Sequence, residues 1–254
     1  MKPVKIYKMK DKNESLYIDK GDMFNLPMKL LVVGKSQISG KSNFLCNLLL
    51  QDDSRLYKNN FKGDDIYIFS GSIQNDEKIK CLIQYFDIPE SNLFSEFDED
   101  ILDTIYEMRK EEFILKQENN EKPNHFLIIL DDMSFGGNLK AKSNGAISKA
   151  FCNGRHILCS VILTSQKLTD ILSVCRENAT GGIFFSCSEK QLDLLEADNN
   201  YLEVGDKNPK KLFRQMFREA TKDKHSFFVV NYSNPYESLY MNKNFLPINT
   251  EQYK

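Results

Sequence analysis

The stretch from residue 28 to residue 50 constrains the fold of this chain more than any other. It opens with a nearly continuous apolar run at 28–33, which is typical of a strand buried on both faces. A polar loop follows and ends in Gly40-Lys41-Ser42, after which apolar residues recur at the three- and four-residue spacing of an amphipathic helix. A buried strand, a glycine-bounded loop and a helix in this order predict a phosphate-binding loop.

The residue types in this loop suit a triphosphate. The N-terminus of a helix offers unpaired N–H groups and the positive end of a dipole, which attract phosphate. Gly40 lets the backbone approach closely, Lys41 would reach the β- and γ-phosphates, and the Ser42 hydroxyl would ligate Mg²⁺. The predicted nucleotide-binding residues are Gly34, Lys35, Ser36, Gln37, Ile38, Ser39, Gly40, Lys41, Ser42 and Asn43.

The spacing of the loop departs from the common pattern, in which four residues separate the two glycines. Here five residues separate Gly34 from Gly40, and Lys35 stands where the first glycine belongs. The tripeptide alone is equally compatible with a chance Gly-Lys-Ser. The buried strand before it and the apolar helix after it favour the nucleotide site, and the shape of the first half of the loop stays open.

Length and composition set the frame for this site. The 254 residues carry a net charge of −2, which neither demands nor excludes nucleic acid, and their number suits one large domain. No stretch approaches the 18 apolar residues of a membrane span, and the polar N-terminus does not resemble a signal peptide. The six cysteines lack metal spacing, so we interpret them as small buried residues of a reducing compartment.

Strands and helices alternate almost throughout, which predicts an α/β fold with a mainly parallel central sheet flanked by helices. We expect residues 1–27 to be an N-terminal elaboration, with short strands near 4–7 and 16–18, and residues 28–254 to form the main domain. The remaining strands are expected at 65–70, 125–130, 157–163, 182–186 and 226–230, and the helices at 76–86, 98–117, 145–153, 168–176, 189–197 and 207–222. The long helix is expected to bury Ile101, Ile105, Met108, Phe113 and Leu115.

Two acids end the most apolar strand. Asp131 and Asp132 follow Leu127–Leu130, at the carboxyl end of a predicted parallel strand, where ligands bind in open α/β sheets. Asp131 would hold Mg²⁺ and Asp132 would activate the attacking water, a place usually taken by Glu. Alone, this pattern fits solvated acids equally well. Its position about 90 residues after Gly-Lys-Ser favours the catalytic interpretation.

Three further polar residues are candidates for phosphoryl-transfer chemistry. Gln166 ends the next strand, where its amide could reach the γ-phosphate and orient water. Arg155 and Arg176 are the only arginines between Arg109 and Arg214. Either could act as an arginine finger toward a neighbouring subunit's nucleotide, and a surface role is equally compatible for each.

A possible contact to nucleic acid lies near the C-terminus. Five cations follow one another at helical spacing at Lys207, Lys211, Arg214, Arg218 and Lys222. Such a stripe could follow a phosphate backbone without sequence preference, and an ordinary solvated face is the alternative.

Four motifs occur in order in this chain: Gly-Lys-Ser at 40–42, LIILDDM at 127–133, NGRHILCSVILTSQ at 153–166 and VCRENATGGIFF at 174–185. Together they resemble the genome-packaging ATPases of large DNA viruses and virophages, which belong to the FtsK–HerA superfamily. The resemblance covers about residues 28–187. It implies a P-loop NTPase of the ASCE, RecA-like type that binds ATP and Mg²⁺ and forms a homo-oligomeric ring.

By the same resemblance, the protein would push double-stranded DNA into a preformed capsid and dock on a capsid or vertex protein. Its place would be the viral factory in the host cytoplasm, with the virion as a second location. Lys41, Ser42, Asp131, Asp132 and Gln166 match family positions. Arg155 or Arg176 would be the arginine that acts in trans.

Three alternatives remain open at this level. A helicase or plasmid-transfer motor of the same class would separate strands on forked DNA. A P-loop kinase would transfer phosphate to a small acceptor without stimulation by DNA. A nucleotide-binding capsid scaffold would show little turnover.

Overall fold

A single mixed sheet organises the parts of the chain that the computed structural model describes, which are residues 5, 7, 9, 13–132, 145–202 and 208–250. The sheet has eight strands in the order β3-β2-β4-β5-β1-β6-β7-β8. They are β1 Lys29–Val33, β2 Ile66–Ser70, β3 Leu93–Phe94, β4 Phe126–Asp131, β5 Cys159–Ser165, β6 Gly181–Phe185, β7 Phe227–Asn231 and β8 Tyr240–Met241. Every pair is parallel except β6–β7 and β7–β8, which confirms the predicted mainly parallel sheet.

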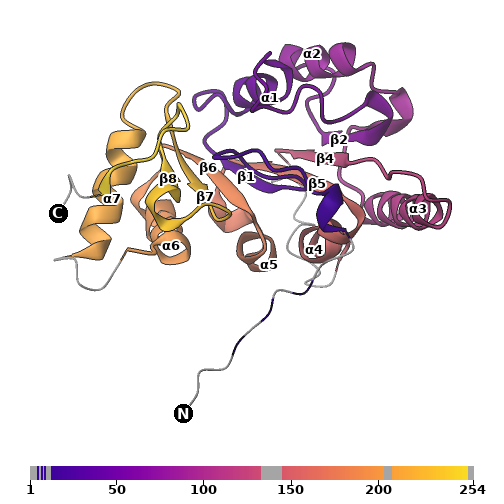
Figure 1. Ribbon diagram of the computed structural model, residues 1–254. Coiled ribbons are helices and arrows are strands. Elements are labelled where there is room, and N and C mark those ends of the chain that lie inside the picture. Colours follow the sequence, from indigo (N-terminus) through magenta and orange to yellow (C-terminus); the bar gives the residue numbers. More distant parts are fainter. Residues whose placement is uncertain are drawn as a thin grey trace.

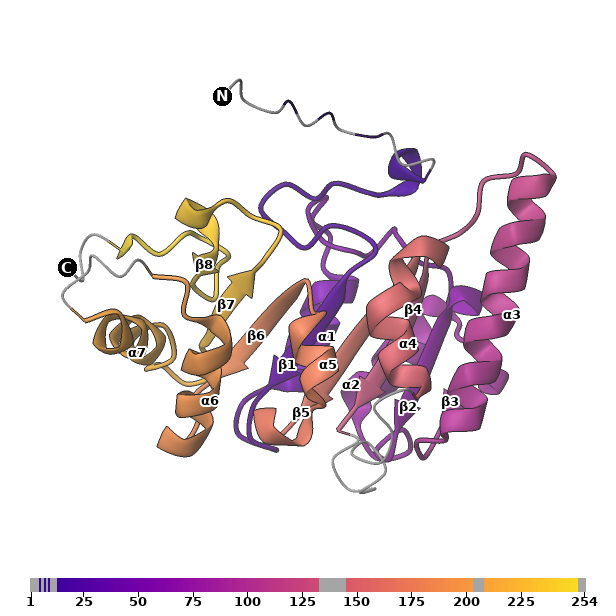
Figure 2. The same ribbon diagram turned by 90° about the horizontal axis from the view of Figure 1, so that it is seen from below.

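Helices cover both faces of the sheet. They are α1 Lys41–Leu50, α2 Glu77–Phe86, α3 Glu99–Glu118, α4 Ala146–Asn153, α5 Ser173–Glu177, α6 Glu189–Asn199 and α7 Pro209–Ala220. Figure 1 shows α1 and α2 above the sheet and α4, α5 and α6 below it. The helices α3 and α7 pack into the same core as that lower layer, which Figure 2 shows from below. No helix within the described ranges is both long and apolar enough to cross a membrane.

The strand that precedes the loop supplies side chains to both layers. Leu30 and Val32 pack into the core under α1 and α2, whereas Leu31 and Val33 pack into the core under α4 to α7. All five residues of β1 are buried. Two apolar cores thus fix the strand that carries the phosphate-binding loop, and this burial explains its unbroken apolar run.

The buried face of α3 differs from the prediction. Ile105 and Phe113 are buried, but Ile101, Met108 and Leu115 are 37%, 48% and 58% exposed. The face that packs on the sheet is instead formed by Leu102, Ile105, Tyr106, Arg109 and Phe113. An arginine is part of this core face because its guanidinium pairs with the buried Asp65 and lies over the ring of Phe126, at 5.0 Å. The prediction from periodicity considered apolar residues alone, so it assigned the wrong face of α3 to the core.

Other element predictions need smaller corrections. The expected strand at 16–18 is a 3-10 turn, Glu14–Leu16, followed by a single bridge between Ile18 and Leu26. Of the strand expected at 4–7, the structure describes only residues 5 and 7, and neither is in a strand. The expected helix at 168–176 is divided into a 3-10 turn, Leu168–Asp170, and α5. The two-residue strands β3 and β8 were not predicted because they are too short for any periodicity.

Two remaining expectations concern cysteines and domains. All six cysteines are free, but only Cys159 and Cys175 are buried, and Cys81 and Cys152 are exposed. Describing all of them as buried was therefore wrong. In the N-terminal part, Phe24 and Leu26 belong to the core under α1. The division into an elaboration at 1–27 and a main domain at 28–254 remains a prediction.

Candidate nucleotide-binding site

The phosphate-binding loop joins β1 to α1 and is closed by its own hydrogen bonds. The Gly34 N–H donates to the Ser165 carbonyl at 3.0 Å and ties the start of the loop to β5. The Ser39 hydroxyl donates to the Lys35 carbonyl at 2.7 Å, and Lys41 Nζ donates to the Gly34 carbonyl at 2.7 Å. The lysine therefore spans the loop from the first turn of α1, in the place a triphosphate would need it.

The two glycines hold the loop in different ways. Gly40 caps α1 with a left-handed φ of 93°, which favours glycine. Gly34 needs space instead, because a Cβ there would lie 2.7 Å from Ser39 Cβ and 2.8 Å from Phe185 Cδ2. Within the loop, Gln37 also adopts a left-handed φ, of 62°. Gly34 thus keeps a role in the loop despite the unusual spacing.

The paired acids lie beside this loop. Asp131 ends β4 and is only 4% exposed. Its carboxylate accepts hydrogen bonds from the Thr164 hydroxyl at 2.7 Å and the Ser70 hydroxyl at 3.0 Å. Burial raises the pKa of Asp131, while these two hydrogen bonds and Lys41 act to lower it. Hydroxyl donors on both neighbouring strands therefore hold one buried carboxylate at the edge of the sheet.

Asp132 and Gln166 form a pair at the same edge. Asp132 follows β4 with a left-handed φ of 50°, and its N–H donates to Thr164 Oγ1 at 2.9 Å. Gln166 follows β5 and its Nε2 donates to Asp132 Oδ2 at 2.9 Å. The predicted water-activating acid and the predicted sensor thus contact each other directly.

A cavity of about 630 Å³ joins these parts. Its walls come from the loop, the end of β2, the start of α2 and the paired acids: Ser36, Gln37, Ser39, Gly40, Lys41, Ser42, Ser70, Gly71, Ser72, Asp76, Lys78, Asp131 and Asp132. Burial lowers the pKa of Lys41, and the nearby Asp132 and Asp131 oppose that shift. An ammonium, two carboxylates and several hydroxyls therefore share one hollow.

Sequence reasoning missed the hydroxyls that support Asp131. Ser70 ends β2 and lies directly opposite Asp131 in the parallel register of β2 and β4. Thr164 lies one strand away on the other side, near the end of β5. Both residues could have been found from the sequence, because polar residues that end neighbouring parallel strands meet at one edge of a sheet. His225, whose Nδ1 lies 3.3 Å from the Ser39 carbonyl, had no such signal because it comes from a turn far along the chain.

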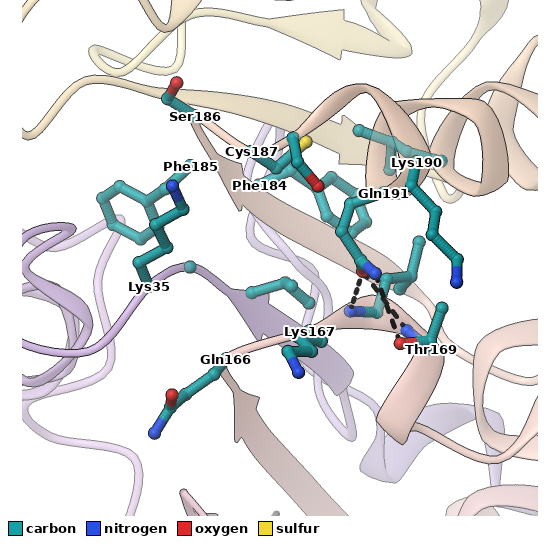
Figure 3. Close-up of a pocket in the computed structure, with 15 residues that line it drawn as sticks. Lys35, Gln166, Lys167, Thr169, Phe184, Phe185, Ser186, Cys187, Lys190 and Gln191 are labelled. Atoms are coloured by element: carbon teal, nitrogen blue, oxygen red, sulfur yellow. Dashed lines mark hydrogen bonds between the residues drawn. The ribbon is translucent and has the colours of Figure 1, made fainter.

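A second cavity, of about 310 Å³, opens on the other side of the loop (Figure 3). Gln166 and Gln191 both line this cavity. The Gln191 Oε1 accepts from the Leu168 and Thr169 N–H groups at 2.7 and 3.4 Å, and its Nε2 donates to Thr169 Oγ1 at 3.2 Å. These bonds attach the 3-10 turn to α6, which explains why the predicted helix from 168 does not continue.

The two candidate arginines lie away from the loop in their own chain. Arg155 is exposed in the 3-10 turn Gly154–Ile157, which precedes β5, and its Nε donates to His156 Nε2 at 3.5 Å. Arg176 lies near the end of α5 and donates to Asp198 Oδ2 at 2.8 Å and to the Ile171 carbonyl at 2.6 Å. Both therefore lie toward the amino ends of the strands, across the sheet from Lys41.

Part of the predicted basic stripe pairs with acids of the neighbouring helix. Arg214 pairs with Asp193 and with Glu189 and Glu196, both at 3.3 Å. Arg218 pairs with Glu189 at 2.7 Å. Lys211 and Lys222 are exposed, and Lys207 lies outside the described residues. The acids of α6, which the spacing within α7 could not reveal, neutralise two of the five cations.

The sheet order and the loop define the class of this protein. The strand with the paired acids, β4, is separated from the loop strand β1 by β5, which carries Gln166 at its end. A chain with this order, a loop ending in Gly-Lys-Ser and these acids has the fold of a P-loop NTPase. It belongs to the Poxvirus A32 protein family, whose sequence profile matches residues 16–244.

Solved structures with the same fold are distant in sequence. The genome packaging NTPase B204 of Sulfolobus turreted icosahedral virus 2, solved with AMP, is 14% identical with a TM-score of 0.53, and 81% of this chain and 93% of that chain are covered. B204 of Sulfolobus turreted icosahedral virus, described as a DNA-packaging ATPase, is 15% identical with a TM-score of 0.51, covering 82% and 94%. EssC (ATPases 2 and 3) of Geobacillus thermodenitrificans is 17% identical with a TM-score of 0.50, covering 72% and 36%. No curated protein sequence matches the chain.

Proposed function

We propose that this protein is a viral genome-packaging motor that hydrolyses ATP and drives double-stranded DNA into a preformed capsid. The observation that carries the proposal is the gathering of Lys41, Asp131, Asp132 and Gln166 at one edge of the sheet, in a chain of the Poxvirus A32 protein family. B204, which shares the fold, is named a genome packaging NTPase and was solved with AMP and with AMPPCP. Nucleotide binding and DNA translocation are therefore the functions that fold, family and site support together.

The oxygen-rich end of the cavity suits Mg²⁺. Ser42 and Asp131 line the same cavity, and hard cations of this size prefer oxygen ligands with substrate phosphates and water completing the shell. The described residues contain no cluster of three or more His, Cys, Asp or Glu side chains that could hold a metal. Bound in this cavity, Mg²⁺ would neutralise charge on the β- and γ-phosphates.

The chain's own residues then supply the rest of the chemistry. Lys41 stabilises negative charge as the phosphoryl group transfers. Asp132 accepts a proton from the attacking water, and Gln166 holds the Asp132 carboxylate at 2.9 Å and orients the water beside it. An aspartate is shorter than the usual glutamate, and the backbone at residue 132 is left-handed. Hydrolysis depends on this pair rather than on either residue alone.

The arginine that completes the site comes from a neighbouring subunit. Strand β5 has seven residues, so at about 3.3 Å per residue the two edges of the sheet lie roughly 20 Å apart. An arginine side chain cannot cross that distance within one chain. Arg155 is exposed, whereas Arg176 is held by Asp198 and the Ile171 carbonyl. We therefore assign the trans-acting role to Arg155 and a structural role to Arg176, and the trans role requires a homo-oligomeric ring.

The remaining partners follow from the same proposal. A packaging motor acts on double-stranded DNA, docks on a capsid or vertex protein, and works in the host cytoplasm where capsids are filled. Of the α7 stripe, Arg214 and Arg218 pair with acids of α6, while the exposed Lys211 and Lys222 stay accessible to DNA.

The test is ATP hydrolysis by the purified protein with and without long double-stranded DNA, over a range of protein concentrations. We expect turnover that rises with DNA and with concentration and is lost in Lys41→Ala, because that change removes the phosphate-binding cation. Lys62→Ala removes an exposed lysine outside the cavity and should keep full activity. Phosphate transfer to a small acceptor without DNA stimulation would identify a kinase instead, and absence of turnover even with capsids present would identify a scaffold.

A further inference from the structure

The outer side of α3 carries a line of apolar residues that the proposed chemistry does not use. Ile101, Met108 and Leu115 follow one another at seven-residue intervals and are 37%, 48% and 58% exposed. Single exposed apolar residues are ordinary on a protein surface, but these three lie on one line, because residues three and four apart in a helix are neighbours. Figure 2 shows α3 at the outer end of the lower layer, beyond α4. The line, which we call the α3 outer face, consists of Ile101, Thr104, Met108, Glu111, Leu115 and Glu118.

This face lies on an acidic helix. The sequence of α3 holds seven acidic and three basic residues. Glu111 and Glu118 are exposed on the face itself, and the exposed Asp100 directly precedes its first apolar residue. An apolar line between acids is complementary to a segment in which apolar and basic residues alternate.

The chain contains such a segment at residues 1–12, which we call the N-terminal arm. Its sequence, MKPVKIYKMKDK, holds five lysines and one aspartate. The apolar residues Pro3, Ile6 and Met9 recur every three residues, and lysines precede each of them. An extended chain of the polyproline-II type has three residues per turn, so it would present these apolar residues on one side at steps of about 9 Å. Seven residues of helix rise about 10.5 Å, so the spacing of the arm is similar to that of the α3 outer face.

We propose that the α3 outer face binds the N-terminal arm of a second copy of this chain. Of the arm, the structure describes residues 5, 7 and 9, and Tyr7 and Met9 are 77% and 87% exposed. These two side chains therefore do not pack on their own chain. The arm and the α3 outer face are two complementary surfaces of one chain, and such surfaces join copies head to tail.

The direction of this contact rests on the proposed function, in which Arg155 acts on a neighbour's nucleotide. Glu14 lines the same cavity as Arg155. Gln117, near the end of α3, donates its Nε2 to Asn13 Oδ1 at 2.9 Å. The arm thus leaves its chain at the amino edge of the sheet, the edge that faces the neighbour's carboxyl edge in the proposed ring.

Helix α3 begins at that carboxyl edge. It follows β3 and precedes β4, and both strands run parallel to β2, so the helix runs from the carboxyl edge back to the amino edge. The arm of one chain therefore meets the first turn of α3 in the next chain, where Glu99 and Asp100 lie. It then follows the outer face toward the other end of the helix.

Sedimentation velocity of full-length variants over a range of concentrations tests this contact. The arm variant carries Ile6→Asp and Met9→Asp, and the face variant carries Met108→Lys and Leu115→Lys. We expect each variant alone to associate at least about tenfold more weakly than wild type, as is usual when apolar anchors are removed from an interface. Leu246→Lys is the control, because Leu246 has a similar exposure of 57% and lies far along the chain, and it should associate like wild type.

A mixture of the two variants distinguishes a second copy from the chain's own α3. The face variant keeps its arm and the arm variant keeps its face, so an equal mixture should form pairs that contain one chain of each kind. If each variant and their mixture stay monomeric where wild type associates, the arm binds its own α3 and the inference is overturned. Wild-type association in either variant alone, or a wild-type protein that stays monomeric throughout, would also overturn it.

Titration of the same proteins with Mg-ATP separates this inference from the proposed function. The substitutions lie outside the nucleotide-binding site, so both variants should bind ATP like wild type, which also shows that they are folded. Normal ATP binding together with unchanged association would overturn the arm contact alone. Absence of ATP binding by wild-type protein would contradict the proposed function, and with it the direction of the contact.

Discussion

Gly34 shows how one residue limits the shape of the phosphate-binding loop. A methyl group there would meet Ser39 and Phe185 at 2.7–2.8 Å, and overpacking of this kind typically costs about 1–3 kcal/mol. We expect Gly34→Ala to lower ATP affinity, measured by titration, by about tenfold or more. Lys62→Ala, at an exposed position outside the cavity, is the control. Equal affinities in the two variants would show that the loop adjusts freely.

Lys29 is a buried lysine at the first residue of β1, the strand that leads into the phosphate-binding loop. It is 2% exposed and its ammonium donates to the Cys159 carbonyl. Burial lowers the pKa of Lys29, and Cys159 partly opposes that shift. Below the folded-state pKa, both folded and unfolded protein bind the proton and the full cost of burying the charge is present. Between that pKa and the unfolded value of about 10.4, only the unfolded state binds it, so the free energy of unfolding increases with pH.

This linkage gives a prediction for Lys29→Met, which removes the titrating group. Wild-type protein should gain stability relative to the variant as the pH rises toward about 10. Urea unfolding at several pH values measures the difference, and Lys62→Met, at an exposed position, should show no such trend. A difference between wild type and Lys29→Met that stays constant over this pH range would contradict the prediction.

At the scale of elements, α7 is held to α6 by charge pairs. Arg214 is 25% exposed and reaches Glu196, which is 7% exposed. Removing Arg214 leaves that acid buried without its cation, which typically costs about 1–3 kcal/mol. We therefore expect Arg214→Ala to lower the free energy of unfolding by this amount and to leave DNA affinity nearly unchanged.

Two measurements on the same preparation distinguish a structural role of α7 from a role in DNA contact. They are unfolding in urea and DNA binding at fixed salt. Lys222→Ala removes an exposed cation of the same helix and should change the free energy of unfolding by less than about 0.5 kcal/mol. If Arg214→Ala kept its stability and bound DNA much more weakly, the stripe would be a nucleic-acid contact after all.

The sequence predicts well those elements whose structure depends on a short, local pattern of residues. The buried run of β1, the loop and the acids after β4 could be predicted because each motif is local and because parallel strands bring their carboxyl ends together. The buried face of α3 could not, since Arg109 depends on Asp65, which lies 44 residues earlier. The pairing of Arg214 and the position of His225 likewise depend on elements that only the folded chain brings together.

At the scale of the whole molecule, the parallel sheet separates two functional edges. The carboxyl edge of β1, β4 and β5 holds Lys41, Asp131 and Gln166, while Arg155 lies at the amino edge before β5. A head-to-tail ring places the amino edge of one subunit against the carboxyl edge of the next. In the proposed ring, one active site would be divided between two chains, so a monomer would lack a residue of its own site.

This division predicts that two inactive variants restore each other. Lys41→Ala removes the loop lysine, and Arg155→Ala removes the arginine, which is worth about 10³-fold or more in related sites. In a random equal mixture, roughly a quarter of ring interfaces combine an intact loop from one chain with an intact arginine from the next. DNA-stimulated ATP hydrolysis should therefore reappear at roughly that fraction of wild-type turnover, because each variant supplies what the other lacks. Arg176→Ala is the control and should hydrolyse ATP without being mixed with another variant. If assembled Lys41→Ala and Arg155→Ala chains stay inactive when mixed, Arg155 does not act in trans.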